Sequence, residues 1–598
     1  MTTTEELGFD PDELRARYEA ERDKRLRPDG AEQYIELTGR FAHYYEEDPY
    51  VDAPIERAPI NAEANVVVIG GGFSGLLAGA RLTEIGIDEF NIIEAGADFG
   101  GTWYWNRYPG AQCDIESYCY LPLLEELEYM PKEKYSFAPE IYEHSRRIGK
   151  HYGLYDKTWF QTRVRSVDWD ESIKRWHLRT NRGDDIRARF VIFALGPANR
   201  PKLPGIEGID DFKGHSFHTA RWDYDYTGGD TNGGMTGLAD KRVAIIGTGA
   251  TAIQCVPRTA ECAQHLYVFQ RTPSSVDLRG NKPTDPDWWK SLSPGWQKAR
   301  RENFAGILAG EQFDEDLVND GWTDIFRNMT SELSGGGSIL DIGKAVELAD
   351  FRKMNSIRRR VEETVNDPAT AEALKPYYRQ MCKRPTFNDE YLPAFNRDNV
   401  TLVDVSESKG IGRITEKGVV ANGVEYAVDC IIFASGFEIT TKLERRIGLP
   451  VNGRDGLSLF EHWGGGIKSL HGFTTRGFPN WFYIGMSQNA FSVNMTQMFD
   501  EQAQHIAYLI KETIDRGATT IEPSEEGQRA WCELIDNFGA MTAALGFFES
   551  CTPGYYNNEG QGQGGLSSGV YAAGINAFNQ LLVDWRERGD LDGMELDR

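Results

Sequence analysis

Two glycine-rich turns, each set between a run of branched apolar residues and a helical stretch, constrain the fold of this chain more than any other feature. The first turn, residues 70–75 (GGGFSG), follows the apolar run 65–69, and the second, residues 247–252 (GTGATA), follows the run 242–246. Continuous apolar runs of this kind are typical of strands buried in a parallel sheet. A strand, a glycine turn and a helix in this order begin a βαβ unit that binds a dinucleotide. The sequence therefore predicts an α/β fold with two Rossmann-like dinucleotide-binding domains.

The first loop has the pattern of a site for the diphosphate of a dinucleotide. G-x-G-x-x-G places one glycine at the turn, one against the diphosphate and one where helix and strand pack closely. The amides at the start of the following helix attract the phosphate charge. A second strand ends in Glu94, about 20 residues past the last glycine, where a carboxylate accepts hydrogen bonds from ribose hydroxyls. The residues assigned to this site are Gly70, Gly72, Phe73, Ser74, Gly75 and Glu94.

The second loop differs in the residues that end its following strand. Residues 270–272 (QRT) supply an arginine there and no carboxylate. A carboxylate would repel a 2′-phosphate, whereas Arg271 can pair with it through a forked, charge-assisted contact. The pattern therefore predicts NADPH rather than NADH. The residues assigned to this site are Thr248, Gly249, Ala250, Thr251, Ala252, Gln254, Arg271 and Thr272.

Two dinucleotide sites in one chain have a limited set of uses. Usually one dinucleotide stays bound as a flavin and the other arrives to reduce it. We therefore expect FAD at the first loop and NADPH at the second. A redox sensor that binds both dinucleotides without catalysis is an alternative, and it would show no NADPH-driven uptake of O₂.

The rest of the chain is organised around these two units. At 598 residues it is long enough for two to four domains. Asp10 and Pro11 predict the start of a charged helix that runs to about residue 25. The N-terminal segment contains no catalytic or binding motif, so we expect it to pack on the surface of the main body. The predicted divisions are an N-terminal helical extension (1–60), the first part of the FAD-binding domain (61–200), the NADP-binding domain (201–395) with a mostly helical insertion (about 285–380), and the second part of the FAD-binding domain with the substrate-pocket region (396–598).

Charge and hydropathy exclude several classes of partner. The 65 Lys and Arg residues against 91 Asp and Glu residues give a formal net charge of −26, which disfavours nucleic acid and anionic membranes. No apolar run reaches the ~18 residues that span a bilayer, and the acidic N-terminus does not resemble a secretory signal. The 8 scattered cysteines favour reduced thiols in a cytoplasm. We expect a cytoplasmic monomer or weak homo-oligomer, and no metal site, because His215 and His218 have no further ligand nearby.

Residues 212–223 (FKGHSFHTARWD) match F-x-G-x-x-x-H-x-x-x-W-[PD], which is the fingerprint of Baeyer–Villiger monooxygenases. The match lies between the two glycine loops, as in that family. Further matches are residues 100–114 (GGTWYWNRYPGAQCD), 383–384 (KR) and 434–437 (ASGF). The chain thus resembles this family from about residue 61 onward. The N-terminal extension and the insert 227–238 resemble the subgroup of cyclopentadecanone and polycyclic ketone monooxygenases. The fingerprint residues are Phe212, Gly214, His218, Trp222 and Asp223.

The resemblance implies that NADPH reduces FAD, that the flavin takes up O₂ as a C4a-peroxyflavin, and that this species converts a bulky or cyclic ketone into an ester or lactone. It makes Arg384 the main catalytic residue, because developing negative oxygen needs a fixed cation in a dry site. Asp114 would orient Arg384, and Lys383 would reach the 2′-phosphate. His218 and Trp222, on a linker between domains, would couple domain motion to NADPH binding.

The resemblance assigns further residues to the cofactors. Gln112 stands where many relatives have arginine. Residues 486–495 would form a wall of the substrate pocket, and residues 554–560 stand where some relatives carry a tryptophan on a mobile loop. Assigned to FAD are Thr102, Trp103, Tyr104, Trp105, Asp114, Tyr120, Val164 and Met495, and to NADP Gln112, Cys113, Lys383 and Arg384.

Two other enzyme classes share the two-dinucleotide layout. A flavin-containing monooxygenase that oxidises nitrogen or sulfur has a similar fingerprint, but it ends in Tyr or Phe where this chain has Trp222 and Asp223. It is kept as the alternative function. A disulfide reductase usually has the redox pair C-x₄-C, whereas Cys113 and Cys119 have five residues between them. We interpret both cysteines as structural.

Overall fold

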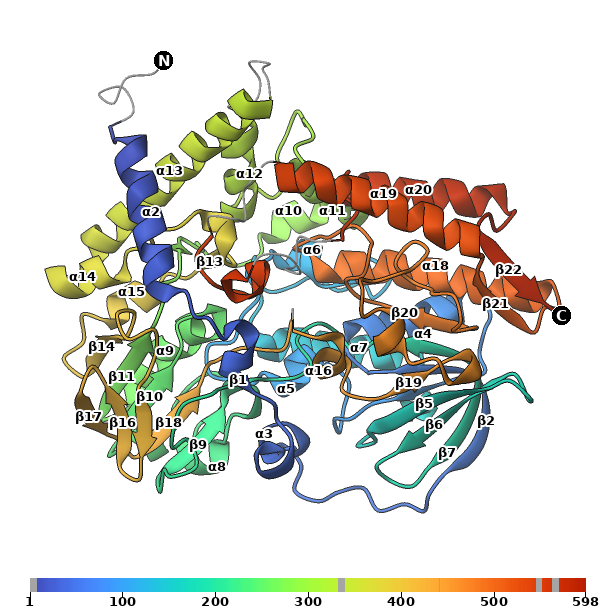
Figure 1. Cartoon of the computed structure of the whole chain (residues 1–598), viewed down its shortest axis with the longest axis horizontal. Coiled ribbons are helices and arrows are strands. Elements are labelled where there is room, and N and C mark those ends of the chain that lie inside the picture. The colour runs from blue at the N-terminus through green and yellow to red at the C-terminus, as the bar shows by residue number, and fades with distance from the viewer. Residues whose placement is uncertain (1–7, 332–338, 440, 545–550, 562–568) are drawn as a thin grey trace.

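A computed structural model gives the fold and describes residues 8–331, 339–439, 441–544, 551–561 and 569–598. Figure 1 shows two β-sheets low in the view, with most of the long helices above them. The glycine-rich residues 334–337 and most of the glycine-rich stretch 560–569 lie outside the described residues. Each of the two predicted glycine loops belongs to a different sheet.

The first sheet has eight strands in the order β19-β5-β6-β7-β2-β3-β4, with β20 also paired to β7. Strand β2 pairs in parallel with β3 and β7, and its residues Val66 to Ile69 are buried, as the apolar run predicts. The bounds are β2 (Asn61–Ile69), β3 (Phe90–Ile93), β4 (Thr158–Trp159), β5 (Val164–Asp170), β6 (Arg175–Thr180), β7 (Asp185–Phe193), β19 (Val451–Asn452) and β20 (Trp481–Tyr483).

The second sheet is parallel throughout, in the order β14-β11-β10-β18-β9. Its last two strands along the chain, β14 and β18, come after residue 395, so the division predicted there falls within this unit. In the sequence, the strands of a small antiparallel sheet, β15-β16-β17, lie between β14 and β18. The bounds are β9 (His215–His218), β10 (Arg242–Ile246), β11 (His265–Gln270), β14 (Val400–Asp404), β15 (Arg413–Thr415), β16 (Gly418–Ala421), β17 (Val424–Ala427) and β18 (Cys430–Phe433).

A helix follows each glycine loop, and other long helices cover the upper part of the molecule (Figure 1). Helix α4 follows the first loop and packs against α18, and α9 follows the second loop. Asp10 caps α2 by accepting hydrogen bonds from the backbone N–H groups of Asp12 (2.9 Å) and Glu13 (3.3 Å). The longer helices are α2 (Pro11–Arg25), α4 (Phe73–Glu84), α7 (Ala138–His151), α9 (Ala250–Cys262), α11 (Trp296–Leu308), α12 (Gly321–Ser331), α13 (Ile339–Thr364), α18 (Met495–Asp515), α19 (Glu525–Ala544) and α20 (Ile575–Arg588).

None of the described helices is long and apolar enough to cross a membrane. Short helices and strands complete the fold. The short helices are α3 (His43–Glu46), α5 (Thr102–Trp105), α6 (Ser117–Tyr120), α8 (Tyr224–Thr227), α10 (Pro286–Lys290), α14 (Pro368–Leu374), α15 (Tyr391–Ala394), α16 (Leu443–Ile447) and α17 (Leu459–His462). The short strands are β1 (Tyr34–Ile35), β8 (Leu203–Pro204), β12 (Val276–Asp277), β13 (Thr386–Phe387), β21 (Thr520–Pro523) and β22 (Met594–Asp597).

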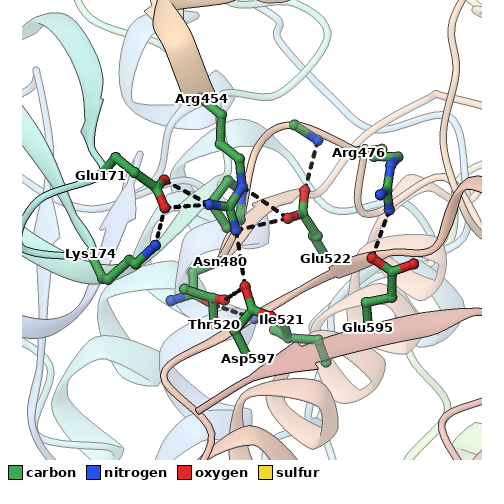
Figure 2. Close-up of polar contacts among 12 residues, drawn as sticks. Glu171, Lys174, Arg454, Arg476, Asn480, Thr520, Ile521, Glu522, Glu595 and Asp597 are labelled. Carbon is green, nitrogen blue, oxygen red and sulfur yellow. Dashed lines mark hydrogen bonds and ion pairs between the residues drawn. The ribbon is translucent and has the colours of Figure 1, made fainter.

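The two-stranded antiparallel sheet of β21 and β22 is joined to the first sheet by Arg454 (Figure 2). Its guanidinium donates to Glu171 (2.6 Å), which follows β5, and to Glu522 on β21 (3.0 Å). It also pairs with Asp597 on β22 at 3.4 Å. One arginine thus connects three segments that lie far apart in the sequence.

The structure corrects one expectation about the cysteines. Cys382 and Cys551 form a disulfide between segments 169 residues apart, whereas the sequence favoured reduced thiols. The other six cysteines are free. A pairing over this distance leaves no local signal in the sequence, because it depends on which loops the fold brings together.

Candidate active site

The first glycine of each loop has a conformation and a contact that only glycine permits. Gly70 has φ +114°, and a Cβ there would lie 2.4 Å from the carbonyl oxygen of Ala194. Gly247 has φ +117°, and its Cβ would lie 2.5 Å from the carbonyl oxygen of Ala434. Such positive φ angles are costly for any residue with a Cβ. The two loops therefore make the same turn in the two units, as their shared motif predicts.

A cavity of about 720 Å³ opens at the first loop. Its volume lies within the range of cofactor pockets. Gly72 directly precedes α4 and lines the cavity. The free backbone N–H groups in the first turn of α4 therefore lie at the edge of the cavity. The predicted residues that line it are Gly70, Gly72, Phe73, Ser74, Glu94, Thr102, Trp103, Trp105, Tyr120 and Val164.

Glu94 lies at the end of β3, at the place where the motif requires a carboxylate. One oxygen accepts from the backbone N–H of Gly71 (2.5 Å) and the other from that of Gly96 (2.6 Å). Burial raises the pKa of Glu94, and the two backbone donors oppose that shift. The carboxylate is thereby fixed in the wall of the cavity.

Four residues assigned to FAD do not line this cavity. Gly75 has a packing role, because a Cβ there would lie 1.8 Å from the Gly70 carbonyl oxygen. The Tyr104 hydroxyl donates to Asp48 (2.6 Å), which holds the ring in the core. Met495 begins α18, and its neighbour Thr496 lines the cavity instead. Asp114 belongs to a neighbouring group of charged residues.

The N-terminal extension contributes to the cavity, which the sequence did not predict. Arg221 anchors it by donating to the carbonyl oxygens of Tyr45 (2.8 Å) and Glu47 (3.0 Å), and it stacks on Trp105 at 3.7 Å. The charged pattern of the segment carries no cofactor motif, so only the fold shows this role. The lining residues from the extension are Glu36, Leu37, Thr38, Gly39, Ala42, Tyr45 and Glu46.

Arg384 and Asp114, the predicted catalytic pair, lie together. The Nη2 of Arg384 donates to Oδ1 of Asp114 at 2.6 Å. The Asp114 side chain is 4% exposed and the Arg384 side chain 45% exposed. The Asp114 carboxylate raises the pKa of Arg384 above its usual value, so the guanidinium stays charged. The Asp114 charge raises the pKa of the Tyr120 hydroxyl and the Arg384 charge lowers it, and Tyr120 itself lines the cavity.

Arg279 is a second cation beside this pair, and the sequence analysis missed it. It is buried, and its Nη1 donates to Oε1 of Gln112. The Nε2 of Gln112 donates to the carbonyl of Tyr135 (2.7 Å), and Gln254 donates to the carbonyl of Gln112 (2.7 Å). Gln112 therefore holds Arg279, and Gln254 joins the Gln112 segment to α9, whereas both glutamines were assigned to NADP. No motif surrounds Arg279 that could have identified it.

Cys113 lies within the same segment as Asp114. Burial and the Asp114 charge raise the pKa of its thiol to about 12. The thiol therefore stays protonated at neutral pH. This favours a structural role for Cys113 over the cofactor contact assigned to it.

At the second loop, the start of α9 is open to solvent. Gly249 is exposed, and a Cβ there would meet no atom within 4 Å. Ala250, Thr251 and Ala252 form the first turn of the helix. Thr248 donates from its hydroxyl to the carbonyl of Thr272 (2.8 Å).

Basic side chains from distant segments meet near this loop. Arg271 follows β11 and pairs with Glu559 at 3.5 Å, and Lys202 pairs with the same carboxylate at 3.7 Å. Lys383 donates to the carbonyl of Pro553 at 2.9 Å. Burial and Arg271 lower the pKa of Lys383 to about 8. Lys202 was not predicted, since it stands in no motif, and Glu559 lies in the segment 554–560, to which the sequence assigned no phosphate contact.

Comparison with known proteins identifies the family. A family model for pyridine nucleotide-disulphide oxidoreductases matches residues 67–298. A Baeyer–Villiger monooxygenase from Stachybotrys chlorohalonatus is 50% identical to this chain over an alignment of 601 positions, gaps included, that covers 99% of this chain and 96% of the relative. The chain belongs to the Baeyer–Villiger monooxygenases. The family and the fold class predicted from the sequence are thus confirmed.

Two solved structures extend the comparison. The polycyclic ketone monooxygenase from Thermothelomyces thermophila is 36% identical, with a TM-score of 0.90, and the match covers 98% of this chain and 99% of the other. A structure described as OTEMO in complex with FAD and NADP is 27% identical, with a TM-score of 0.72, over 90% of this chain and 100% of the other. The first match therefore includes the N-terminal extension of the present chain.

The Baeyer–Villiger fingerprint forms part of the second sheet, whereas we expected a linker. His218 ends β9, the edge strand, and Trp222 follows a short helical turn. Both side chains are fully buried, and the indole of Trp222 donates to the Thr227 hydroxyl at 3.1 Å. Asp223 pairs with His215 at 2.8 Å. Phe212 and Gly214 precede the strand, and a Cβ on Gly214 would lie 2.4 Å from the Phe212 ring.

The predicted substrate-pocket wall, residues 486–495, leads into α18. Asn494 donates to the carbonyl of Cys119 at 3.1 Å, and Thr496 donates to the carbonyl of Tyr120. The segment thus supports the Tyr120 side of the cavity in this Baeyer–Villiger monooxygenase. Its contact with a substrate stays a prediction.

Proposed function

We propose that the protein is a cytoplasmic, FAD- and NADPH-dependent monooxygenase that oxidises a bulky or cyclic ketone with O₂ to an ester or lactone. The observation that carries the proposal is the Arg384–Asp114 ion pair, whose charges act on the Tyr120 hydroxyl in the lining of the cavity. The size of the substrate rests on the likeness to the polycyclic ketone monooxygenase over almost the whole chain. We propose a monomer or weak homo-oligomer.

The residues present at the first loop fit FAD. The open N-terminus of α4 suits a diphosphate, and Glu94 suits a ribose. Trp103 and Tyr120, joined by a 2.9 Å hydrogen bond, form an aromatic wall that excludes water. When bound and reduced, the flavin supplies the activation of O₂. The N-terminal extension lines part of the same cavity.

Arg384 provides the charge that the reaction requires. Attack on a ketone carbonyl turns its oxygen into an oxyanion, which a fixed guanidinium stabilises in a site of low dielectric constant. Asp114 binds only one edge of Arg384, through Nη2, and 45% of the arginine side chain remains exposed. The other guanidinium donors are thus available to a substrate. Asp114 acts by holding the arginine in place.

The proposal is tested by incubating the FAD-loaded protein with NADPH, O₂ and a panel of linear, monocyclic and polycyclic ketones. We expect esters or lactones, identified by mass spectrometry, with the highest rates for the larger ketones. Amines and sulfides serve as comparison substrates. Turnover of amines with every ketone returned unchanged would support the nitrogen- and sulfur-oxidising alternative instead.

Arg271→Gln is expected to raise the KM for NADPH about 100-fold, since a phosphate loses a forked, charged partner. The KM for NADH should change little, because NADH has no 2′-phosphate. Steady-state oxidation of both cofactors measures the two constants. Arg242→Gln, on β10 and paired with Asp429 at 3.2 Å, is the matched control. Equal increases for both cofactors would show that Arg271 does not recognise the phosphate.

NADPH affinity is expected to fall as the pH rises through about 8. Lys383 has its pKa lowered to about 8, so it is protonated below that pH and neutral above it. Only the protonated form attracts the 2′-phosphate. Titration of NADPH binding between pH 7 and pH 9.5 measures the effect, with NADH as the reference. Lys383→Met should remove this pH dependence, and its persistence in that variant would contradict the assignment.

A further inference from the structure

We propose that the Glu559 carboxylate occupies the site for the 2′-phosphate of NADPH in the free enzyme and must leave it when the cofactor binds. Glu559 would thereby set both the affinity for NADPH and the discrimination against NADH. This inference rests on the proposed function, because it takes Arg271 as the residue that recognises the 2′-phosphate. We call the group formed by Tyr34, Lys202, Arg271 and Lys383 around Glu559 the basic cluster.

The basic cluster surrounds one carboxylate with donors from distant parts of the chain. Glu559 Oε1 lies 3.3 Å from the Tyr34 hydroxyl and 3.7 Å from Lys202 Nζ. Its Oε2 lies 3.5 Å from Nη2 of Arg271. Lys383 acts on it electrostatically. Burial alone would raise the pKa of Glu559, but Lys202 and Arg271 outweigh that effect and lower it, so the carboxylate is charged.

The distances show that the carboxylate fits this site loosely. Charge-assisted hydrogen bonds to a carboxylate are usually 2.7–2.9 Å long, whereas the three contacts of Glu559 measure 3.3, 3.5 and 3.7 Å. Three basic side chains also face a single negative charge. A phosphate monoester carries about −1.5 to −2 charges and three terminal oxygens. It matches both the size and the charge of the basic cluster better than Glu559 does.

Burial explains why an internal anion is needed. The side chains of Glu559 and Lys202 are only 6% and 7% exposed. Cations held close together away from water repel one another unless an anion lies between them. A carboxylate in the free enzyme and a phosphate in the bound enzyme would meet that requirement in turn.

The segment that carries Glu559 is tethered beside the site. Cys551 is linked to Cys382, which directly precedes Lys383, and Asn557 accepts from the N–H groups of Gly554 (3.0 Å) and Gly560 (3.1 Å). A tethered group has a high effective concentration at its site. It therefore competes with a dissolved cofactor even though each contact is long.

The backbone conformation at Glu559 indicates that the basic cluster holds this residue in place. Asn558 and Glu559 both have left-handed φ angles, +50° and +55°. Two such residues in succession are strained unless their surroundings impose the geometry. Release of the carboxylate would relieve this strain, so exchange for a phosphate requires only a local change.

The test compares the binding of three ligands: NADPH, NADH and adenosine 2′,5′-bisphosphate, which carries the 2′-phosphate without the nicotinamide. Calorimetry on the FAD-loaded protein gives each Kd. We expect Glu559→Gln to lower the Kd of NADPH and of the bisphosphate on the order of tenfold, with the Kd of NADH nearly unchanged. Glu559→Asp keeps the charge, so its Kd for NADPH and for the bisphosphate should lie between that of the unaltered protein and that of Glu559→Gln. Glu425→Gln, on the exposed strand β17, is the control for loss of one negative charge.

Arg271→Gln separates the two possible failures. If it weakens bisphosphate binding while Glu559→Gln leaves binding unchanged or weaker, the phosphate site is correct and the role of Glu559 is overturned. If Arg271→Gln has no effect on the bisphosphate, the assignment of the phosphate site fails, and the inference fails with it. Thermal unfolding and FAD content of each variant confirm that the folded holoenzyme is being compared.

Discussion

Replacing Arg384 with alanine is expected to lower the rate of ester formation by about 10³-fold while FAD remains bound. Loss of one preorganised donor to an oxyanion typically costs 10²–10³ in rate, and here the whole charged group is removed. Arg384 does not line the cavity at the first glycine loop, so FAD binding should be retained. The measurement is ester formed per bound FAD, with the product quantified by mass spectrometry.

Two variants make this result specific. Arg384→Lys keeps a charge without the planar fork and should recover only part of the rate. Arg187→Ala removes a half-buried arginine from β7, where it pairs with Glu63 at 3.3 Å, and should leave the rate unchanged. A near-normal yield of ester from Arg384→Ala would show that another group stabilises the oxyanion. Arg279, the buried cation beside Asp114, would then be the next residue to replace.

The second large effect is expected from Gly70→Ala, which should abolish FAD binding. A Cβ at this position would lie 2.4 Å from the carbonyl oxygen of Ala194, and the φ angle of +114° is unfavourable for alanine. The loop must therefore move, and the amides of α4 move with it. The absorbance of flavin in the purified protein measures the loss directly.

Two further glycines separate a local effect from a general one. Gly86→Ala has φ +80° but meets no atom within 4 Å, so it introduces a similar strain without the clash and should retain FAD. Gly247→Ala places a Cβ 2.5 Å from the Ala434 carbonyl and should weaken NADPH binding while FAD remains. Full FAD content in Gly70→Ala would mean that the first loop does not hold the flavin.

Much of this fold follows from local sequence patterns. The buried runs before Gly70 and Gly247 predict parallel strands because no polar alternation is present, and the glycines predict the turn that follows each strand. Asp10 predicts the start of α2 because its side chain caps the free N–H groups. The pairing of Arg384 with Asp114 could be anticipated only through the resemblance to a family, since the residues lie 270 positions apart.

The remaining features depend on contacts between distant segments. Strands β14 and β18 complete the second sheet, but nothing in their own residues indicates which sheet they join. The same is true of the N-terminal extension along the cavity and of the disulfide between Cys382 and Cys551. Glu559 and Lys202 are ordinary charged residues until the fold brings them to Arg271. Long-range pairing, rather than local propensity, determines this part of the site.

The most direct test of the account follows the fate of O₂. The holoenzyme is supplied with NADPH, a polycyclic ketone and isotopically labelled O₂, and the product is analysed by mass spectrometry. The account predicts one labelled oxygen atom in each ester molecule, one NADPH oxidised per ester, and loss of the ester in Arg384→Ala. Full consumption of NADPH and O₂ with the ketone recovered unchanged and unlabelled would contradict it.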